Sequence, residues 1–219
     1  MINVDNTILE ISNLKKIYHD KKSEILAIEN IDLKVKDKEF ISIVGPSGCG
    51  KSTLLSILSG LENKSSGNIS LNNNLKIGYM LQKDSLFPWR TIFENCLIGL
   101  EVSNTLTEES KNRVIKLLET YGLKDFMNKY PDSLSGGMRQ RVALIRTLAT
   151  NPDILLLDEP FSALDYQTRL ALSDDVYKII KNEGKTAIMV THDLAEAISL
   201  SNRIVVLTKR PAKVKCIYD

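Results

Sequence analysis

The sequence predicts an α/β domain with a mainly parallel sheet, because apolar runs of strand length alternate with segments of helical periodicity. Phe40–Val44 is a nearly continuous apolar run that stops at Gly45, which suits a strand buried on both faces. Ile154–Leu157 and Ala187–Val190 are runs of the same kind. The stretch from about 91 to 150 is rich in helical patterns, and we interpret it as an inserted subdomain.

The segments around the first buried run follow the same alternation. Before it, Ile31, Leu33 and Val35 alternate with polar residues, as in a half-buried strand. After it, a helix is expected whose apolar positions are Leu54, Leu55, Ile57, Leu58 and Leu61. Within the helical stretch, one apolar stripe is formed by Val114, Leu117, Leu118 and Tyr121.

The composition is that of a globular chain with a sizeable core, since 43% of the 219 residues are hydrophobic and 26% are charged. The net charge of +2, from 29 basic and 27 acidic residues, does not indicate a nucleic-acid-binding polycation. No apolar run reaches the ~20 residues needed to cross a bilayer, and Met1–Ile11 lacks the layout of a signal peptide. The chain is therefore expected to stay in the cytosol, with three free thiols.

The first chemical motif is a glycine-rich loop that fits the pattern G-x-x-x-x-G-K-[ST], with a buried strand before it and a helix after it. It is formed by Gly45, Pro46, Ser47, Gly48, Cys49, Gly50, Lys51 and Ser52. Glycines let the backbone turn tightly and direct N–H groups at phosphate oxygens, and the following helix adds its positive end. Lys51 is expected to reach the β- and γ-phosphates, and Ser52 to ligate Mg²⁺.

The second motif is a pair of carboxylates, Asp158 and Glu159, directly after the buried run Ile154–Leu157. This order predicts Asp158 at the carboxyl end of a strand beside the phosphate loop, where it can hold Mg²⁺ or its waters. Glu159 is then positioned to orient or deprotonate the attacking water. A strand that merely leaves the core is the alternative, but the presence of the phosphate loop favours the functional interpretation.

The third motif separates classes of nucleotide hydrolase, since the first two would also fit kinases and switch GTPases. Leu134, Ser135, Gly136 and Gly137 open a helix of apolar periodicity, and they offer N–H groups and a hydroxyl to an anion. This signature lies between the other two motifs along the chain. With that order of motifs, the chain resembles the ABC ATPases over nearly its full length.

The resemblance implies a P-loop NTPase fold, with a RecA-like core, an N-terminal antiparallel β-subdomain and an inserted α-helical subdomain. The single domain 1–219 then divides into an ATP-binding core, 1–85 and 149–219, and a helical signature subdomain, 86–148. The cofactors implied are ATP and Mg²⁺.

The resemblance also implies roles for individual residues. Gln82 is similar to the glutamine that senses Mg²⁺ and the water near the γ-phosphate, and His192 to the switch histidine on that phosphate. Tyr18 takes the place of the aromatic residue that stacks on adenine. Asp165 ends the D-loop, residues 162–165 including Ala163, which in the family crosses to the opposite subunit. The expected catalytic residues are Glu159, His192 and Gln82; the expected Mg²⁺ ligands are Ser52, Gln82 and Asp158; the nucleotide-binding set also includes Thr53.

The resemblance further implies that one chain holds half of each active site, so that the phosphate loop of one copy faces the signature of a second copy across ATP.

The segment Leu86–Asn95 is most similar to importers of the nitrate, sulfonate and taurine group, and Tyr130-Pro131 and Lys209-Arg210-Pro211 fit that group. In importers this surface receives a membrane permease. Leu86, Phe87 and Trp89 are the expected docking patch, and packing within the domain is the alternative. The chain would then lie peripherally on the cytoplasmic face of the cell membrane and act only indirectly with an extracytoplasmic substrate-binding protein.

Three other classes share the motifs. ATPases of DNA repair and chromosome maintenance insert long coiled coils, whereas Lys51 and Ser135 are joined here by a short helical region without sustained heptads. There is no basic patch for DNA, and no nucleic-acid partner is expected. Soluble factors that act on ribosomes normally carry two cassettes, and this chain has one. An exporter cassette is disfavoured by Leu86–Asn95 and stays open.

Overall fold

The computed structural model of this protein describes residues 6–20, 23–72, 74–162 and 164–219. These residues form a nine-stranded sheet in the order β4-β1-β2-β9-β8-β3-β7-β6-β5. One half of the sheet is parallel, and it consists of β3 (Phe40–Val44), β5 (Ile77–Met80), β6 (Ile154–Asp158), β7 (Thr186–Thr191) and β8 (Arg203–Leu207). The predicted α/β class with a mainly parallel sheet is confirmed.

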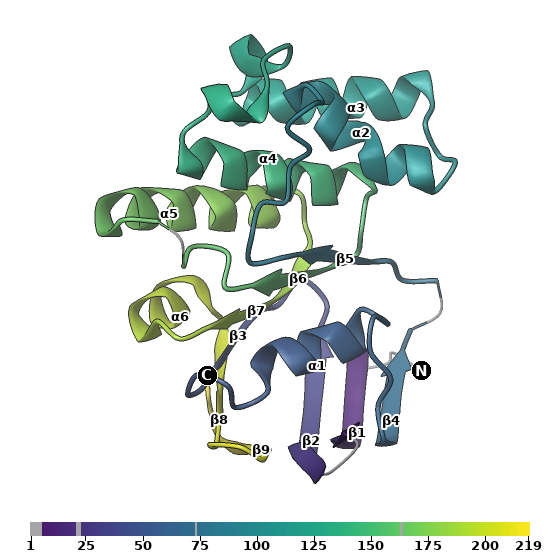
Figure 1. The fold of residues 1–219 in the computed structure, drawn as a ribbon, viewed down its shortest axis with the longest axis vertical. Helices are drawn as coiled ribbons and strands as arrows, with labels where there is room; N and C mark the ends of the chain where they lie inside the picture. Colours follow the sequence, from purple (N-terminus) through teal and green to yellow (C-terminus); the bar gives the residue numbers. More distant parts are fainter. Residues whose placement is uncertain (1–5, 21–22, 73, 163) are drawn as a thin grey trace.

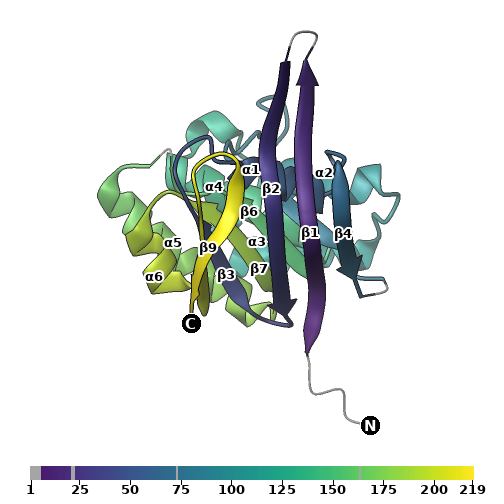
Figure 2. The same ribbon diagram turned by 90° about the horizontal axis from the view of Figure 1, so that it is seen from below.

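The other half of the sheet is built mainly from antiparallel neighbours. β1 (Thr7–Asp20) pairs antiparallel with β2 (Ser23–Lys36) on one side and with β4 (Ser66–Leu71) on the other. β9 (Ala212–Tyr218) joins the two halves, because it runs antiparallel to β8 and parallel to β2. Figure 2 shows β2, β1 and β4 side by side at the front of the view. The antiparallel N-terminal part that the resemblance implied is therefore present.

Helices lie on both faces of the sheet. α1 follows β3, α2, α3 and α4 lie between β5 and β6 along the chain, α5 follows β6, and α6 follows β7. Figure 1 shows α2, α3 and α4 as one group, on the opposite side of the parallel strands from α1. The bounds are Lys51–Leu58 for α1, Ile92–Val102 for α2, Glu108–Thr120 for α3, Gly136–Ala149 for α4, Tyr166–Asn182 for α5 and Leu194–Leu200 for α6, with short 3₁₀ turns at Lys124–Phe126 and Pro131–Ser133.

The parallel strands separate two apolar cores. β3, β6 and β7 are buried along their whole length, as expected for parallel strands covered on both faces. Alternate side chains of β6 enter different cores. Leu155 and Leu157 pack with α2–α5, whereas Ile154 and Leu156 pack with α1 and the antiparallel strands. The unbroken apolar runs of the sequence reflect these two cores.

The expected apolar stripe of α1 is too long by one residue. Leu54, Leu55, Ile57 and Leu58 are buried, but the helix ends at Leu58, and Leu61 is 72% exposed. Gly60 has a φ of 77°, and a glycine in this left-handed conformation is a common way to end a helix. The prediction for Leu61 was therefore wrong, because the spacing of apolar residues alone does not reveal where the helix ends.

Within the described ranges, no helix is both long enough and apolar enough to cross a membrane.

Candidate active site

A cavity of about 440 Å³ opens beside the loops that follow β3 and β6. It is lined by Tyr18, Ile25, Ala27, Ser47, Gly48, Gly50, Lys51, Ser52, Thr53, Gln82, Glu159 and Arg210. The structure thus brings together residues of the phosphate loop, the strand pair β1–β2 and two loops from the middle of the chain. Sequence reasoning does not single out Ile25, Ala27 or Arg210 for this cavity.

The glycine-rich loop connects β3 to α1 and wraps around the Lys51 side chain. Gly48 and Gly50 have φ values of 70° and 123°, which residues with a side chain rarely adopt. Lys51 is only 5% exposed, and its Nζ donates to the carbonyls of Gly45 (2.8 Å) and Pro46 (3.2 Å). The cation is therefore held within the loop, at the N-terminus of α1, where an anion would be attracted by both.

Cys49 differs from its neighbours in the loop, because its side chain points into the protein. The thiol is 1% exposed and belongs to the core that contains α1. A Cβ atom added to Gly45 would lie 3.0 Å from Cys49 Sγ, so the two residues pack tightly. The backbone of Cys49 belongs to the loop, but its side chain packs in the core.

Asp158 ends β6 and is almost fully buried, at 8% exposure. Ser52 Oγ donates to its Oδ1 at 3.0 Å, and Tyr79 Oη donates to its Oδ2 at 3.0 Å. Burial raises the pKa of Asp158, while the two donated hydrogen bonds oppose that rise. Burial, followed by the Asp158 charge, also raises the pKa of Tyr79 to about 12. Tyr79 lies on β5, next to β6, and only this strand pairing brings it to the carboxylate.

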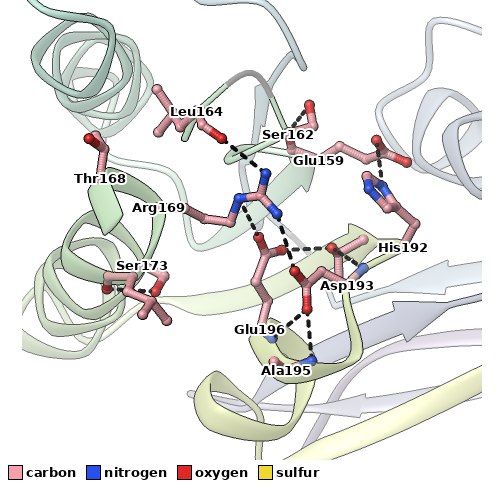
Figure 3. A network of polar contacts seen from close by, with 12 residues as sticks. Glu159, Ser162, Leu164, Thr168, Arg169, Ser173, His192, Asp193, Ala195 and Glu196 are labelled. Carbon is pink, nitrogen blue, oxygen red and sulfur yellow. Dashed lines mark hydrogen bonds and ion pairs between the residues drawn. The ribbon is translucent and has the colours of Figure 1, made fainter. Parts of the chain in front are cut away.

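The carboxylate of Glu159 contacts His192 and Gln82, the two other residues expected to be catalytic. Its Oε2 lies 3.1 Å from Nδ1 of His192 and 3.4 Å from Nε2 of Gln82. Figure 3 shows the imidazole of His192 directed at this carboxylate. Gln82 Nε2 also donates to Ser162 Oγ at 3.1 Å. Glu159 has a φ of 43°, and such backbone strain in a residue with a side chain is typical of functional positions.

The residues expected to hold Mg²⁺ offer oxygen donors of the kind that this ion prefers. Ser52 and Asp158 are hydrogen-bonded to each other, and Ser52 and Gln82 line the cavity. The described part of the chain contains no cluster of three or more His, Cys, Asp or Glu residues that could hold a metal alone. A Mg²⁺ ion at Asp158 would therefore also need phosphate oxygens and water, as is usual for this ion.

Tyr18 lies at the far side of the cavity, on β1, opposite Ile25 of β2. Its ring is 37% exposed, and Nζ of Lys16 lies 4.6 Å from the ring centre. Lys16 is itself fixed by an ion pair with Glu62 at 2.6 Å. The exposed ring offers a flat apolar surface that is supported from one side by a cation.

The signature residues have local structural roles in this chain. Leu134 is buried in the core under α2–α5, and Ser135 caps α4 by accepting a hydrogen bond from the N–H of Met138 at 3.3 Å. A Cβ atom added to Gly137 would lie 3.2 Å from a methyl group of Thr168, so α4 and α5 approach closely there. Of the residues that the structure describes, none from 134 to 137 lines the cavity.

Asp165 of the D-loop is the N-cap of α5. Its Oδ1 accepts a hydrogen bond from the N–H of Thr168 at 3.0 Å, and this backbone hydrogen bond lowers the pKa of Asp165. Ala163, in the same loop, lies outside the described residues.

Comparison with known proteins identifies the family to which this site belongs. Residues 28–162 match the ABC transporter family. The chain belongs to that family. An uncharacterized ABC transporter ATP-binding protein from Bacillus subtilis is 49% identical over 96% of this chain and 83% of its own length. An aliphatic sulfonates import ATP-binding protein from Bacillus cereus is 39% identical over 96% and 85%. A nitrate import ATP-binding protein from Synechocystis is 38% identical over 94% and 80%.

The fold of this ABC chain is similar to solved structures of the cassette MJ0796. One is the dimeric structure of a post-hydrolysis state with ADP and Pi, with a TM-score of 0.81, 32% identity and coverage of 97% of this chain and 98% of that one. The dimeric structure of MJ0796 as a bacterial ABC transporter cassette gives 0.82, 33%, 97% and 98%. The P-loop NTPase fold is confirmed, and the chain is an ATP-binding, ATP-hydrolysing ABC subunit.

Proposed function

We propose that this chain energises a membrane importer for a small oxyanionic solute of the nitrate, sulfonate or taurine kind. The observation that carries the proposal is the exposed aromatic pair Phe87 and Trp89. The pair lies on the segment that follows Gln82, and this segment is hydrogen-bonded to the signature helix α4. The relatives with import functions in their names support the direction of transport.

The expected docking patch divides into a packing residue and an exposed pair. Leu86 packs against the core under α2–α5. Trp89 is 70% exposed and Phe87 is 38% exposed, with ring centres 5.1 Å apart. A large aromatic side chain in water is typical of interfaces, where burial of its surface contributes strongly to binding. This pair is the proposed contact with a permease.

The segment between Gln82 and the aromatic pair is attached firmly to α4. Arg146 donates from Nη1 to the carbonyl of Ser85 (2.8 Å) and from Nη2 to that of Asp84 (2.7 Å). Gln140 Nε2 donates to the Gln82 carbonyl at 3.4 Å. A displacement at Trp89 would therefore be transmitted to Gln82 in the cavity and to the helix that begins at the signature.

The roles of the cavity residues are part of the proposal. Lys51 and the loop N–H groups would bind the β- and γ-phosphates, and Tyr18 would stack on the adenine. Ser52, Asp158 and Gln82 would hold Mg²⁺, which when bound neutralises phosphate charge. Glu159 would accept the proton of the attacking water, with His192 and Gln82 fixing the position of its carboxylate.

A head-to-tail dimer completes the site in this proposal. The cavity lacks a contribution from the signature of its own chain within the described residues, and the similar solved structure with ADP and Pi is dimeric. A second copy would supply Ser135 and Gly137 to the nucleotide and Asp165 to the interface. The chain would then act peripherally at the membrane, as a core, 1–85 and 149–219, with a helical part, 86–148.

Uptake by intact cells tests the importer assignment. Cells with the native gene and cells with Glu159→Gln would be given labelled nitrate, taurine and an alkanesulfonate in turn. The proposal expects uptake of at least one of them to be lost in the variant cells, and expects Trp89→Ala to reduce the same uptake while purified protein keeps its ATP binding. Unchanged uptake of all three solutes, or ATPase activity that responds to DNA and not to membranes, would contradict it.

A further inference from the structure

We propose that Arg169 is a positioning residue that links the D-loop to the segment carrying His192. The proposal rests on the roles assigned to Glu159 and His192 in the proposed function. Arg169 lies in the first turn of α5, outside the cavity, and touches none of the cavity-lining residues by a hydrogen bond among the described contacts. Its function would be carried out through other residues.

The guanidinium of Arg169 joins two loops that come from different strands. Nη2 donates to the carbonyl of Leu164, in the D-loop after β6, at 3.0 Å. Nη1 donates to Oδ2 of Asp193, after β7, at 3.2 Å. Asp193 directly follows His192, whose imidazole meets Glu159. Figure 3 shows the guanidinium between Leu164 on one side and the Asp193–Glu196 turn on the other.

The turn that carries His192 is held by hydrogen bonds among Thr191, Asp193 and Glu196. Asp193 and Glu196 also contact the Arg169 guanidinium. Thr191 Oγ1 donates to Oε2 of Glu196 at 2.7 Å and accepts from the N–H of Asp193 at 3.0 Å. Glu196 is 7% exposed, and its Oε1 lies 3.8 Å from Nε of Arg169. Both chain neighbours of His192 therefore belong to a network in which Arg169 is the cation.

The location of Arg169 is unfavourable for the helix that contains it. A cation in the first turn of a helix opposes the helix dipole, and α5 has no acidic residue in that turn. Asp193 shares its carboxylate, because Oδ1 caps α6 through Ala195 at 2.8 Å while Oδ2 binds Arg169. Arg169 is thus stabilised by tertiary contacts with the turn after β7, which offset its unfavourable interaction with the helix dipole.

The link has room to tighten. The Nε–H of Arg169 is buried, and no described group accepts a hydrogen bond from it. Nε of Arg169 lies 3.8 Å from Oε1 of Glu196, which is close enough for an ion pair but too far for a hydrogen bond. A small movement of Leu164 towards a second copy would carry the guanidinium with it and change the position of the His192 turn. Binding of the second copy would in this way alter the contact between His192 and Glu159.

The test uses the isolated full chain and two matched arginine variants. Arg169→Met removes the charge and keeps the length of the side chain. Arg113→Met is the control, because Arg113 also forms an ion pair at α5, with Glu183 at 3.4 Å and similar side-chain exposure, but at the far end of the helix. Steady-state ATPase activity, ATP affinity and melting temperature would be measured for both, and Arg169→Lys would test whether charge without the planar fork restores activity.

The expected result is a split between kcat and KM. Arg169→Met should lower kcat about tenfold or more, as a misplacement of a catalytic group does, while KM and ATP affinity stay within about twofold. Arg113→Met should change neither. In a Glu159→Gln background, Arg169→Met should still form the ATP-dependent dimer.

Three outcomes would overturn the proposal: an unchanged kcat in Arg169→Met, an equal loss in Arg113→Met, or loss of the ATP-dependent dimer, which would make Arg169 an interface residue. Failure of the proposed function is seen separately, because Glu159→Gln alone would then retain turnover or cells would retain uptake.

Discussion

Nδ1 of His192 lies 3.1 Å from Oε2 of Glu159, and the same oxygen lies 3.4 Å from Nε2 of Gln82. One carboxylate oxygen is therefore approached by polar groups from the turn after β7 and from the segment after β5. These contacts hold the Glu159 carboxylate at the wall of the cavity. A general base must be held in hydrogen-bond reach of its water, and such fixation is what the role needs.

Glu159→Gln should abolish turnover and spare ATP binding. The amide has the shape of the carboxylate and can keep a contact to His192, but it cannot accept a proton from water. A loss of about 10²–10⁴ in kcat is expected for removal of a general base, with ATP affinity within about twofold of the native chain. Single-turnover hydrolysis and fluorescent-nucleotide binding would measure the two quantities. Near-native hydrolysis would show that the proton acceptor lies elsewhere.

The phosphate loop and the Asp158–Glu159 pair are recognisable from the sequence because their function depends on consecutive residues. The same is true of β3, β6 and β7, whose complete burial leaves unbroken apolar runs. Tyr79 and Arg210 were not predictable in this way. Tyr79 reaches Asp158 only through the pairing of β5 with β6, and Arg210 reaches the Gly48 carbonyl, at 2.8 Å, from a residue 162 positions away.

The contacts of Arg169 were likewise not predictable from the sequence. In the sequence nothing marks Arg169 for a tertiary contact, and solvent exposure is the ordinary expectation for an arginine. Its contacts with Asp193 and Glu196 depend on the parallel pairing of β6 and β7, which brings the loops after both strands to one edge of the sheet. Long-range pairing of this kind leaves no local periodicity to read.

Trp89→Ala should cost little stability, less than about 1 kcal/mol, because a surface substitution away from special features is close to neutral. Trp89 is 70% exposed, whereas Ile92, three residues later, is fully buried. Ile92→Ala is the matched comparison, and it should cost about 2–5 kcal/mol. Urea denaturation would measure both free energies of unfolding. A loss of ~3–5 kcal/mol for Trp89→Ala, as for a core Trp, would favour packing over docking.

Thiol reagents should modify Cys216 first in the folded chain. Cys49 and Cys96 are buried at 1% and 0% exposure, whereas Cys216 is half-buried on β9. Burial also raises the pKa of Cys96 to about 12, so its reactive thiolate is scarce at neutral pH. We expect one fast-reacting thiol per native chain and three after denaturation, and Cys216→Ser should abolish the fast one. Rapid reaction of Cys49 would show that the phosphate loop opens.

The pH dependence of stability should change in opposite directions when two glutamates are replaced by glutamine. Burial raises the pKa of Glu196 above its ordinary value of 4.5, with the hydrogen bond from Thr191 opposing the rise. The hydrogen bond from Lys16 lowers the pKa of Glu62 below the same ordinary value. Each glutamine variant removes one of these titrations.

A carboxyl group whose pKa is higher in the folded state binds its proton more tightly there, so its contribution to stability is present at low pH and is lost as the pH rises through the folded pKa. The free energy of unfolding of the native chain minus that of Glu196→Gln should therefore fall as the pH rises from about 4 towards 7. For Glu62, whose folded pKa is lowered, the contribution is present above the unfolded pKa and is lost as the pH falls. The difference between the native chain and Glu62→Gln should therefore rise with pH in the region below about 4.5, between the lowered folded pKa and the ordinary value. Urea denaturation at a series of pH values would measure both slopes, and slopes of the same sign would contradict the opposite environments assigned to these two side chains.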